Sequence, residues 1–334
     1  MHIWNSLDEV PLDFGPCVVT LGNFDGLHRG HQEVLGQVRA EAAARGAHSV
    51  ALTFDPHPAL IHRPESAPAQ IMGLEEKLAA MAALGLDGVL VMPYNLEFAQ
   101  QTPREFIENV FVRGLRACAV VVGEDVRFGR GNAGELSTMQ ELGRQLGFDV
   151  ITVNDEGHDR RWSSTWVREA LDKGEVDTAA QVLGRHHSVR GEVVHGAARG
   201  RELGFPTANL SAKSTGIIPA DGVYAGWLTD SRGHRWPAAI SVGSNPTFVG
   251  VSRQVEAHVI DRPEEPVEDF NLYGQRVRLE FVRHLRGMVA YTGPAALIEQ
   301  MHLDVVQARQ VLAAPPRGAA ASHSPASTEA PAVD

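Results

Sequence analysis

Residues 17–31, with the sequence Cys17-Val-Val-Thr-Leu-Gly-Asn-Phe-Asp-Gly-Leu-His-Arg-Gly-His31, decide how the first half of the chain folds. The apolar run at 17–22 predicts a buried strand, and the Gly-Asn-x-Asp-Gly turn that follows ends it. A helix predicted at 29–45 begins directly after the turn. This order of strand, glycine turn and helix is typical of a phosphate-binding site, because the first N–H groups of a helix lack partners within it and carry partial positive charge.

His28 and His31 stand where this helix begins, three residues apart, so their imidazoles face the same way. Two imidazoles beside a helix N-terminus can hold a polyphosphate while negative charge shifts on it. A pair of ordinary surface histidines is the alternative, since the chain has 15 histidines. A metal site is a weaker hypothesis, because two further ligands at suitable spacing are missing from the motif.

The composition predicts an ordinary globular protein with two domains. Its 334 residues exceed one typical domain, and 43% hydrophobic with 21% charged residues can supply a full core. A formal net charge of −11 argues against a general surface for nucleic acid or anionic membranes. Residues 1–7 lack a signal pattern, and no run approaches the ~18 apolar residues of a membrane helix. We therefore expect a soluble cytoplasmic protein with no nucleic-acid or membrane partner.

The two cysteines are expected to be free. Cys17 and Cys118 both lie in apolar, strand-like runs, which favours small buried hydrophobic residues. Their spacing matches neither a disulfide framework nor a zinc site.

Strand-like and helix-like segments alternate through the first half of the chain. The strand-like runs are apolar throughout, as in parallel strands that are covered on both faces. The predicted strands are 17–22, 48–54, 88–92, 117–123 and 149–153, and the predicted helices are 29–45, 74–84, 103–114, 137–147, 163–173 and 175–184. Thr102, Pro103 and Glu105 supply good start chemistry for one of these helices. The order predicts a doubly wound, Rossmann-like α/β domain over residues 1–186, with ligands at the carboxyl ends of its strands.

The pattern changes after residue 186. Strand-like segments separated by Gly, Pro and Asn turns predict a small antiparallel β-barrel. Its expected strands are 188–195, 221–229, 235–242, 253–261 and 275–284. A helix at 294–312 carries apolar residues at steps of three and four, which predicts an amphipathic helix that covers the barrel. The second domain is thus expected at 187–313, and the Ala-, Pro- and Ser-rich residues 314–334 are expected to form a disordered tail.

Three further polar stretches end on the same side of the predicted sheet as the histidine motif. They are residues 53–58, 123–129 and 162–168, and each follows a predicted strand. Because ligands bind at this edge in doubly wound sheets, the stretches are candidates for one shared site. Asp125 and Arg127, in the second stretch, fit an ordinary ion pair within the loop equally well.

The third stretch places Ser163, Ser164 and Thr165 at the start of a predicted helix. A helix cap accounts for one of these hydroxyl residues. Three in succession, followed by Arg168 at helical spacing, favour a second phosphate contact at a second helix N-terminus.

The motifs at 22–31 and 163–168 together resemble the nucleotidyltransferase half of the bacterial bifunctional riboflavin kinase/FAD synthetases. The resemblance implies transfer of AMP from ATP to FMN, with release of pyrophosphate. It implies the nucleotide-binding residues Gly22, Asn23, Phe24, Asp25, His28, His31, Asp125, Ser164, Thr165 and Arg168. In this set His28 and His31 take the catalytic role at the ATP phosphates. Val126 stands where the family usually has an aromatic residue and Trp162 where it has a small aliphatic one, which affects ligand fit more than activity.

A second candidate site lies where residues 196–209 enter a strand-like segment. In an extended segment Thr207 and Asn209 project to one face, with Ala208 on the other. A hydroxyl and an amide oxygen side by side are hard ligands suited to Mg²⁺. A flexible loop that enters a strand is the alternative interpretation.

The segment Val255-Glu-Ala-His-Val259 alternates with a period of two, so Glu256 and His258 share one face of the predicted strand. An exposed strand face would explain this pattern. A carboxylate held near an alcohol could instead act as a general base.

The stretches at 200–209, 245–248, 255–258 and 272–274 resemble the riboflavin kinase half of the same family. Within them, Pro-Thr-Ala-Asn at 206–209 is the most specific element. The resemblance implies that Thr207 and Asn209 bind Mg²⁺ and ATP phosphates, and that Glu256 activates the riboflavin 5′-hydroxyl as a catalytic residue. The implied nucleotide- and flavin-binding residues are Gly200, Arg201, Gly204, Phe205, Thr207, Asn209 and Arg286. Tyr291 stands where Phe is usual.

The resemblance covers about residues 15–312 and implies one chain that makes FMN from riboflavin and then FAD from FMN. The implied co-substrate is ATP, the implied metal is Mg²⁺, and the implied partners are small molecules: riboflavin, FMN and FAD as substrate or product. In the alternative, the first half acts on another phosphate ester or is only a flavin-binding regulatory module. The stretches at 54–58 and 163–165, together with the fused kinase half, argue against another phosphate ester. A regulatory module predicts lost polar residues in one motif set, and none is lost. The sequence leaves a homo-oligomer open.

Overall fold

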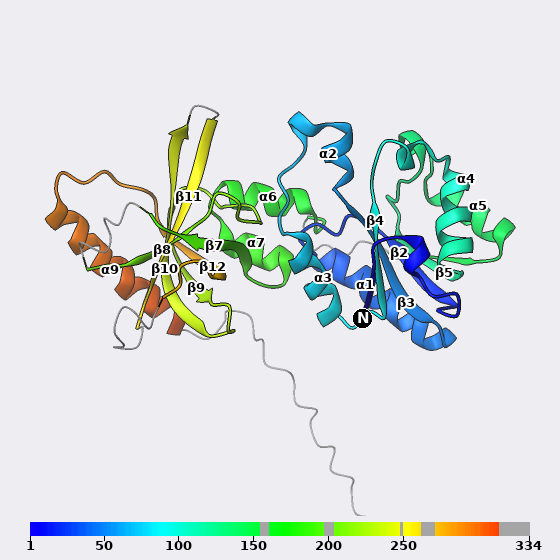
Figure 1. Cartoon of the computed structure of the whole chain (residues 1–334), viewed down its shortest axis with the longest axis horizontal. Coiled ribbons are helices and arrows are strands. Elements are labelled where there is room, and N and C mark those ends of the chain that lie inside the picture. The colour runs from blue at the N-terminus through cyan, green and yellow to red at the C-terminus, as the bar shows by residue number, and fades with distance from the viewer. Residues whose placement is uncertain (154–159, 197–203, 248–249, 262–270, 314–334) are drawn as a thin grey trace, which may run out of the picture.

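The computed structural model describes residues 1–153, 160–196, 204–247, 250–261 and 271–313. A parallel sheet with helices forms the N-terminal half, a closed barrel forms the C-terminal half, and helices α6 and α7 lie between them (Figure 1). Gly200, Arg201 and the predicted tail lie outside the described residues, so the expectations for them are not tested.

The N-terminal sheet has six parallel strands in the order β1-β4-β3-β2-β5-β6. They are β1 (His2–Trp4), β2 (Cys17–Leu21), β3 (His48–Asp55), β4 (Gly88–Pro93), β5 (Ala117–Gly123) and β6 (Asp149–Val153). The five predicted strands are confirmed to within one residue, whereas β1 was not predicted. From β2 the chain adds β3 and β4 on one side of that strand, and then β5 and β6 on its opposite side. This reversal creates the crevice in which doubly wound sheets bind ligands.

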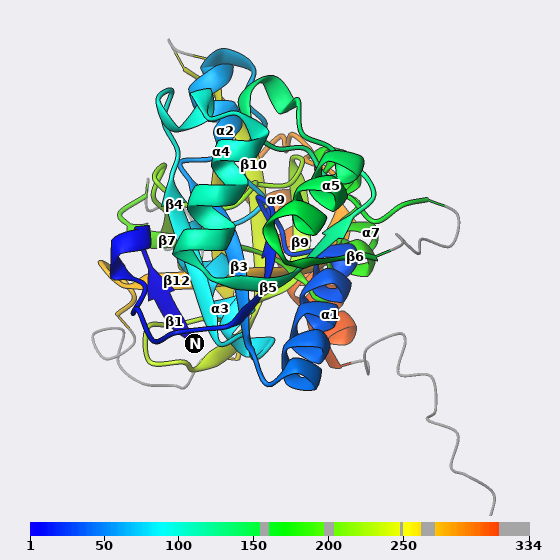
Figure 2. The same ribbon diagram turned by 90° about the vertical axis from the view of Figure 1, so that its right-hand side faces the viewer.

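Helices cover both faces of this sheet (Figure 2). They are α1 (Arg29–Arg45), α2 (Pro58–His62), α3 (Leu74–Ala83), α4 (Pro103–Phe106), the π-helix η4 (Ile107–Gly114), α5 (Leu136–Leu146) and the short 3-10 helices η1 (Leu7–Glu9), η2 (Pro64–Ser66), η3 (Phe98–Gln100) and η5 (Arg130–Asn132). One buried cluster joins the sheet to α4, η4 and α5, and a second joins it to α1 and α3. The predicted start of α4 is confirmed, because Thr102 and Glu105 form a reciprocal capping box. Cys17 and Cys118 are both free, as predicted.

The C-terminal barrel is antiparallel and closes in the order β10-β11-β8-β7-β12-β9. Its strands are β7 (His187–Val194), β8 (Thr207–Leu210), β9 (Gly222–Thr229), β10 (Arg235–Thr247), β11 (Gly250–Val259) and β12 (Arg276–Arg286). The prediction of a barrel is confirmed, but it had five strands and omitted the four-residue β8. The prediction also ended β10 five residues early, because Gly243, Asn245 and Pro246 look like turn residues.

Helices α6 (Ser164–Asp172) and α7 (Val176–Leu183) pack against the barrel. Leu171 of α6 and Leu183 of α7 belong to the same buried cluster as Leu279 and Phe281 of β12. A backbone hydrogen bond from Ala220 N to the Leu171 carbonyl, 2.9 Å long, adds to this contact. The two helices therefore form a layer that the barrel holds in place.

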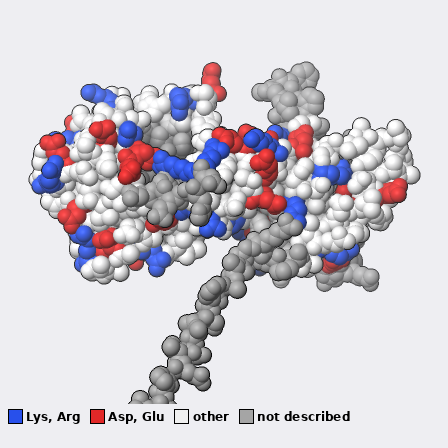
Figure 3. Space-filling view, turned by 180° about the vertical axis from the view of Figure 1, so that it is seen from behind, with Lys and Arg blue, Asp and Glu red and all other residues white. Residues whose placement is uncertain are grey.

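The last helix, α9 (Pro294–Ala313), covers the other side of the barrel, as predicted. Ala308 is fully buried and packs with Ala225 of β9 and with Ile260. Over both halves of the face in Figure 3, positive and negative side chains are interspersed. The described residues include no helix long and apolar enough to cross a membrane.

Candidate functional site

A cavity of about 920 Å³ opens at the carboxyl edge of the parallel sheet. Its walls come from the segments that follow β2, β3, β4 and β5 and from the start of α6. Representative lining residues are Asn23, His28, His31, His57, Tyr94, Asp125 and Trp162. The three polar stretches predicted to share one edge therefore do line one cavity.

His28 and His31 lie together at the start of α1, as their spacing predicted. Their ring centroids are 3.6 Å apart, and His28 Nδ1 caps the helix by accepting a hydrogen bond from the His31 backbone N–H at 3.4 Å. Burial, followed by the charges of Arg161 and Arg185, lowers the pKa of His28 to about 4. Burial also lowers the pKa of His31 well below its usual value. Both rings are therefore neutral near pH 7 before any anion binds.

The His31 ring carries unused hydrogen-bonding capacity. Its Nδ1 is buried and has no partner among the residues that the structure describes. A buried nitrogen without a partner is costly, so a ligand that supplies one would bind favourably.

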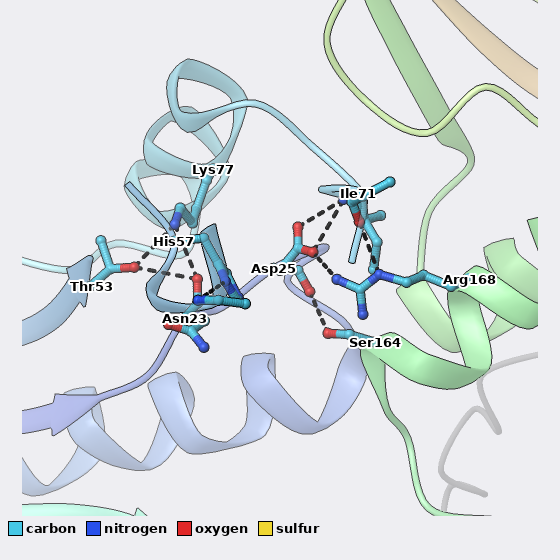
Figure 4. A network of polar contacts seen from close by, with 10 residues as sticks. Asn23, Asp25, Thr53, His57, Ile71, Lys77, Ser164 and Arg168 are labelled. Atoms are coloured by element: carbon cyan, nitrogen blue, oxygen red, sulfur yellow. Dashed lines mark hydrogen bonds and ion pairs between the residues drawn. The ribbon is translucent and has the colours of Figure 1, made fainter. Parts of the chain in front are cut away.

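The turn before the histidines is fixed by Asp25, which is only 6% exposed. Its carboxylate accepts a hydrogen bond from the Ile71 backbone N–H at 2.9 Å and pairs with the Arg168 guanidinium (Figure 4). Arg168 also donates to the Ala69 carbonyl at 2.9 Å. Asp25 thus fixes the turn through its carboxylate, and Arg168 holds that carboxylate.

Lys77 of α3 supports the same turn from the opposite side, and sequence reasoning missed it. The residue is 9% exposed, and its Nζ donates to the Asn23 carbonyl at 3.0 Å and to Thr53 Oγ1 at 3.1 Å (Figure 4). Burial lowers the pKa of Lys77, against the opposing charges of Asp25 and Asp55. No local signal marks this lysine, because it sits in an ordinary helix 54 residues beyond its backbone partner.

The three hydroxyl residues at the start of α6 have different contacts. Ser163 caps the helix by accepting from the Trp166 backbone N–H at 3.2 Å, so the prediction that a cap explains one of them is confirmed. Ser164 Oγ donates to the Asp25 carbonyl at 2.8 Å, and Thr165 is exposed. Their contact with a phosphate stays a prediction.

The loop after β5 forms a different ion pair from the one considered for it. Asp125 pairs with Arg161 at 2.9 Å, and Arg127 donates to the Val126 carbonyl at 2.8 Å. The alternative pairing of Asp125 with Arg127 is therefore wrong. Asp125 lies on the cavity wall together with Val126 and Arg161.

The second candidate site is assembled on two paired strands of the barrel. Register places Asn209 of β8 opposite Glu256 of β11. Thr207 Oγ1 lies 3.3 Å from Glu256 Oε2 and 3.3 Å from Asn209 Nδ2. Ala208 is buried, so the predicted common face for Thr207 and Asn209 is confirmed.

This second site brings together side chains that carry hard oxygen ligands. The Thr207 hydroxyl lies within hydrogen-bond distance of both the Glu256 carboxylate and the Asn209 amide, and oxygen atoms of these three groups fit the ligands that Mg²⁺ prefers. Gly196 lies so close that a Cβ there would be 2.5 Å from Asn209 Cγ, so only glycine fits at this position.

Two other residues expected at the second site have internal partners. Phe205 is buried and packs edge-on against His258 and His302, and Gly204 adopts φ +84. Arg286 forms two hydrogen bonds to the Asp304 carboxylate of α9, at 2.8 and 2.6 Å. Its implied contact with a ligand stays a prediction.

Comparison with known proteins assigns a family to each half. A family model for FAD synthetase matches residues 11–166, and one for riboflavin kinase matches residues 183–312. Curated proteins called bifunctional riboflavin kinase/FMN adenylyltransferase match both halves together. The one from Escherichia coli K12 is 34% identical over 92% of this chain and 95% of its own, and the one from Pseudomonas fluorescens is 35% identical over 94% and 99%.

The fold also matches a solved structure along most of its length. The crystal structure described as a macrolide-efflux protein from Streptococcus pneumoniae aligns with a TM-score of 0.82 and 28% identity, over 92% of this chain and 98% of that one. The relative from Bacillus subtilis, again a bifunctional riboflavin kinase/FMN adenylyltransferase, is 32% identical over 92% of this chain. The two family models match successive parts of the chain, and the relatives align along more than 90% of it. The chain therefore belongs to the family of bifunctional riboflavin kinase/FMN adenylyltransferases.

Proposed function

We propose that this chain phosphorylates riboflavin to FMN in its barrel half and adenylylates FMN to FAD at the cavity of its parallel-sheet half. The observation that supports the proposal is the presence of a cluster of polar side chains in each matched family segment. The alternative, a half without catalytic turnover, predicts a site stripped of its polar residues. His28, His31 and Asp125 line one site, and Thr207, Asn209 and Glu256 meet in the other.

Adenylyl transfer needs positioning more than a protein nucleophile. A phosphate oxygen of FMN attacks the α-phosphorus of ATP, and the bond to the leaving pyrophosphate breaks. His28 and His31, at the N-terminus of α1, hold the phosphates and stabilise the charge that develops on the pyrophosphate. Ser164, Thr165 and Arg168 stand at the start of α6, the second helix N-terminus at this edge of the cavity, where a triphosphate would meet them.

Riboflavin phosphorylation needs a base near an alcohol. Glu256 accepts the proton of the riboflavin 5′-hydroxyl while its oxygen attacks the γ-phosphorus of ATP, and ADP leaves. Thr207 and Asn209, beside Glu256, orient the phosphates. Mg²⁺, held by Thr207 and Asn209, would neutralise charge on the transferred group.

The proposal includes a division of the chain at 186/187 and a cytoplasmic location, where ATP is available. The matched FAD synthetase segment ends at residue 166, and the matched riboflavin kinase segment begins at residue 183, shortly before this division.

A time course tests the proposal directly. The purified chain is incubated with riboflavin, ATP and Mg²⁺, and flavins are separated by chromatography. FMN should form first and FAD should follow at the expense of FMN. FMN without FAD, from riboflavin or from supplied FMN, would leave only the kinase and contradict the first half of the proposal.

Two matched variants separate the sites. Glu256→Ala should lower riboflavin phosphorylation by about 10²–10⁴-fold, while FAD still forms from supplied FMN. His28→Ala should lower FAD formation by about 10²–10³-fold, so FMN accumulates. Loss of both activities in either variant would show that the two sites are not separable.

A further inference from the structure

The turn at 23–27, which precedes the catalytic histidines, has a backbone that needs external support. Phe24 and Leu27 have φ values of 49 and 44, in the left-handed region that residues other than glycine avoid. Such conformations persist where surrounding contacts fix them. The turn leads directly into His28, so its conformation sets the direction of both imidazoles.

Side chains from distant parts of the chain hold the carbonyl groups of this turn. The bonds run from Lys77 Nζ to Asn23 O at 3.0 Å, from Ser164 Oγ to Asp25 O at 2.8 Å, from Arg185 Nη2 to Gly26 O at 2.8 Å, and from Arg185 Nη1 to Leu27 O at 3.3 Å. Arg185 alone bonds two carbonyls in succession. Its planar guanidinium has several donors in a fixed geometry, which suits this double contact.

Arg185 precedes the proposed division at 186/187, but it lies in a part of the chain that packs on the barrel. It lies within the segment that matches riboflavin kinase, between α7 and β7. Immediately before it, Val182 and Leu183 are buried in the cluster that includes Leu279 of the barrel. The anchor of Arg185 is therefore the barrel, whereas its hydrogen-bond acceptors, Gly26 and Leu27, lie in the segment that matches FAD synthetase.

We propose that Arg185 is a positioning residue of the adenylyl-transfer site, supplied by the segment between α7 and β7 that is anchored on the barrel, to hold the turn that aims His28 and His31. The inference rests on the proposed function. It means that FAD formation depends on the contact between the two halves, although the two reactions use separate sites.

Steady-state kinetics of Arg185→Met test this role. The substitution removes the donors and keeps an unbranched side chain of similar reach. With FMN supplied, kcat for FAD formation should fall about 10- to 100-fold, because a small misplacement of a catalytic group costs rates of this order. The KM for FMN should stay within about twofold of the unmodified chain, as should kcat for riboflavin phosphorylation. Arg185→Lys, which keeps a donor at this position, should restore part of kcat.

Arg276→Met is the matched control. Arg276 of β12 also reaches from the barrel to the other half, where it pairs with Glu75 at 3.2 Å, but both side chains are more than half exposed and neither touches the turn. This control should form FAD at the normal rate.

Three outcomes would overturn the positioning role. They are an unchanged kcat in Arg185→Met, an equal loss in Arg276→Met, or a parallel loss of both activities with a lower melting temperature, which would mark a general structural role. A failure of the unmodified chain to form FAD from FMN would overturn the proposed function itself, and is seen before any variant is measured.

Discussion

The imidazoles of His28 and His31 stack with their centroids 3.6 Å apart, at the N-terminus of the helix that opens the cavity. Burial is the main cause that lowers both pKa values; the charges of Arg161 and Arg185 add to it for His28, and the charge of His28 adds to it for His31. The site is therefore assembled with neutral imidazoles. A bound polyphosphate supplies the negative charge that favours their protonation.

The lowered pKa of His28 predicts a loss of stability in mild acid. The unfolded chain binds a proton to this residue near pH 6.5 and the folded chain only near pH 4, so the stability is complete above pH 6.5 and falls between these values. From pH 7 to pH 5 this one residue accounts for a loss on the order of 2 kcal/mol. Urea unfolding should show that His28→Asn, which keeps a capping side chain, loses less stability over this interval. Equal losses in the two proteins would contradict the prediction.

The arrangement of Thr207, Asn209 and Glu256 predicts that the Mg²⁺ concentration needed for riboflavin phosphorylation depends on Asn209. Asn209→Ala removes one oxygen ligand from the candidate metal site, so the Mg²⁺ concentration for half-maximal riboflavin phosphorylation should rise by about tenfold or more. The Mg²⁺ dependence of FAD formation by the same variant serves as the control and should not move. A parallel shift in both reactions would place the metal effect outside the barrel site.

The strands of the parallel sheet and the histidine motif could be predicted because their signals are local. An apolar run such as 117–123 marks a buried strand, and a spacing of three brings His28 beside His31. The sequence predicts an extended segment at 207–209, but β8 is missing from the predicted barrel because four residues are too few to establish a period. The contacts of Lys77 and Arg185 could not be predicted, because both residues donate to backbone carbonyls far away in the chain. Every residue has a backbone carbonyl, so no residue type in the sequence marks these acceptors.

Arg286 illustrates how a tertiary partner changes the interpretation of a residue. The sequence offered it as a ligand contact, whereas the structure pairs it with Asp304, whose side chain is 6% exposed. Asp304 lies on the face of α9 that the apolar periodicity assigned to the barrel. The buried carboxylate is satisfied by the Arg286 guanidinium and by the Gln300 amide, which donates to Asp304 Oδ1 at 3.0 Å.

Removing Asp304 should loosen α9. Asp304→Ala leaves the Arg286 guanidinium largely buried without its acceptor, which should cost about 3 kcal/mol of unfolding free energy. Arg309→Ala is the matched control, because Arg309 of α9 also pairs with a carboxylate, that of Asp261, but both side chains are more than half exposed. That control should cost less than about 1 kcal/mol. Thermal or urea unfolding measures both, and equal costs would contradict a structural role for the buried pair.

Trp162 stands just before the start of α6. It lines the cavity and stacks on Trp166 with centroids 5.4 Å apart and planes 8° from parallel. A flat indole held in this way offers a stacking surface to a planar ring, and both adenine and the flavin have one. Trp162→Leu should therefore raise the KM of ATP or of FMN in FAD formation by about 5- to 10-fold, which corresponds to about 1 kcal/mol of stacking energy.

The effect of Trp162→Leu should be confined to binding. Its kcat for FAD formation should stay within about twofold, because the indole contacts no group that the proposed reaction changes, and riboflavin phosphorylation should not change. Trp162→Phe should keep part of the affinity, since a smaller ring still stacks. Trp166→Leu supplies the matched control, because Trp166 packs beneath Trp162 against Arg160 and is not part of the described cavity wall. If both KM values stay unchanged in Trp162→Leu, or if Trp166→Leu raises them as much, the stacking role of Trp162 is wrong.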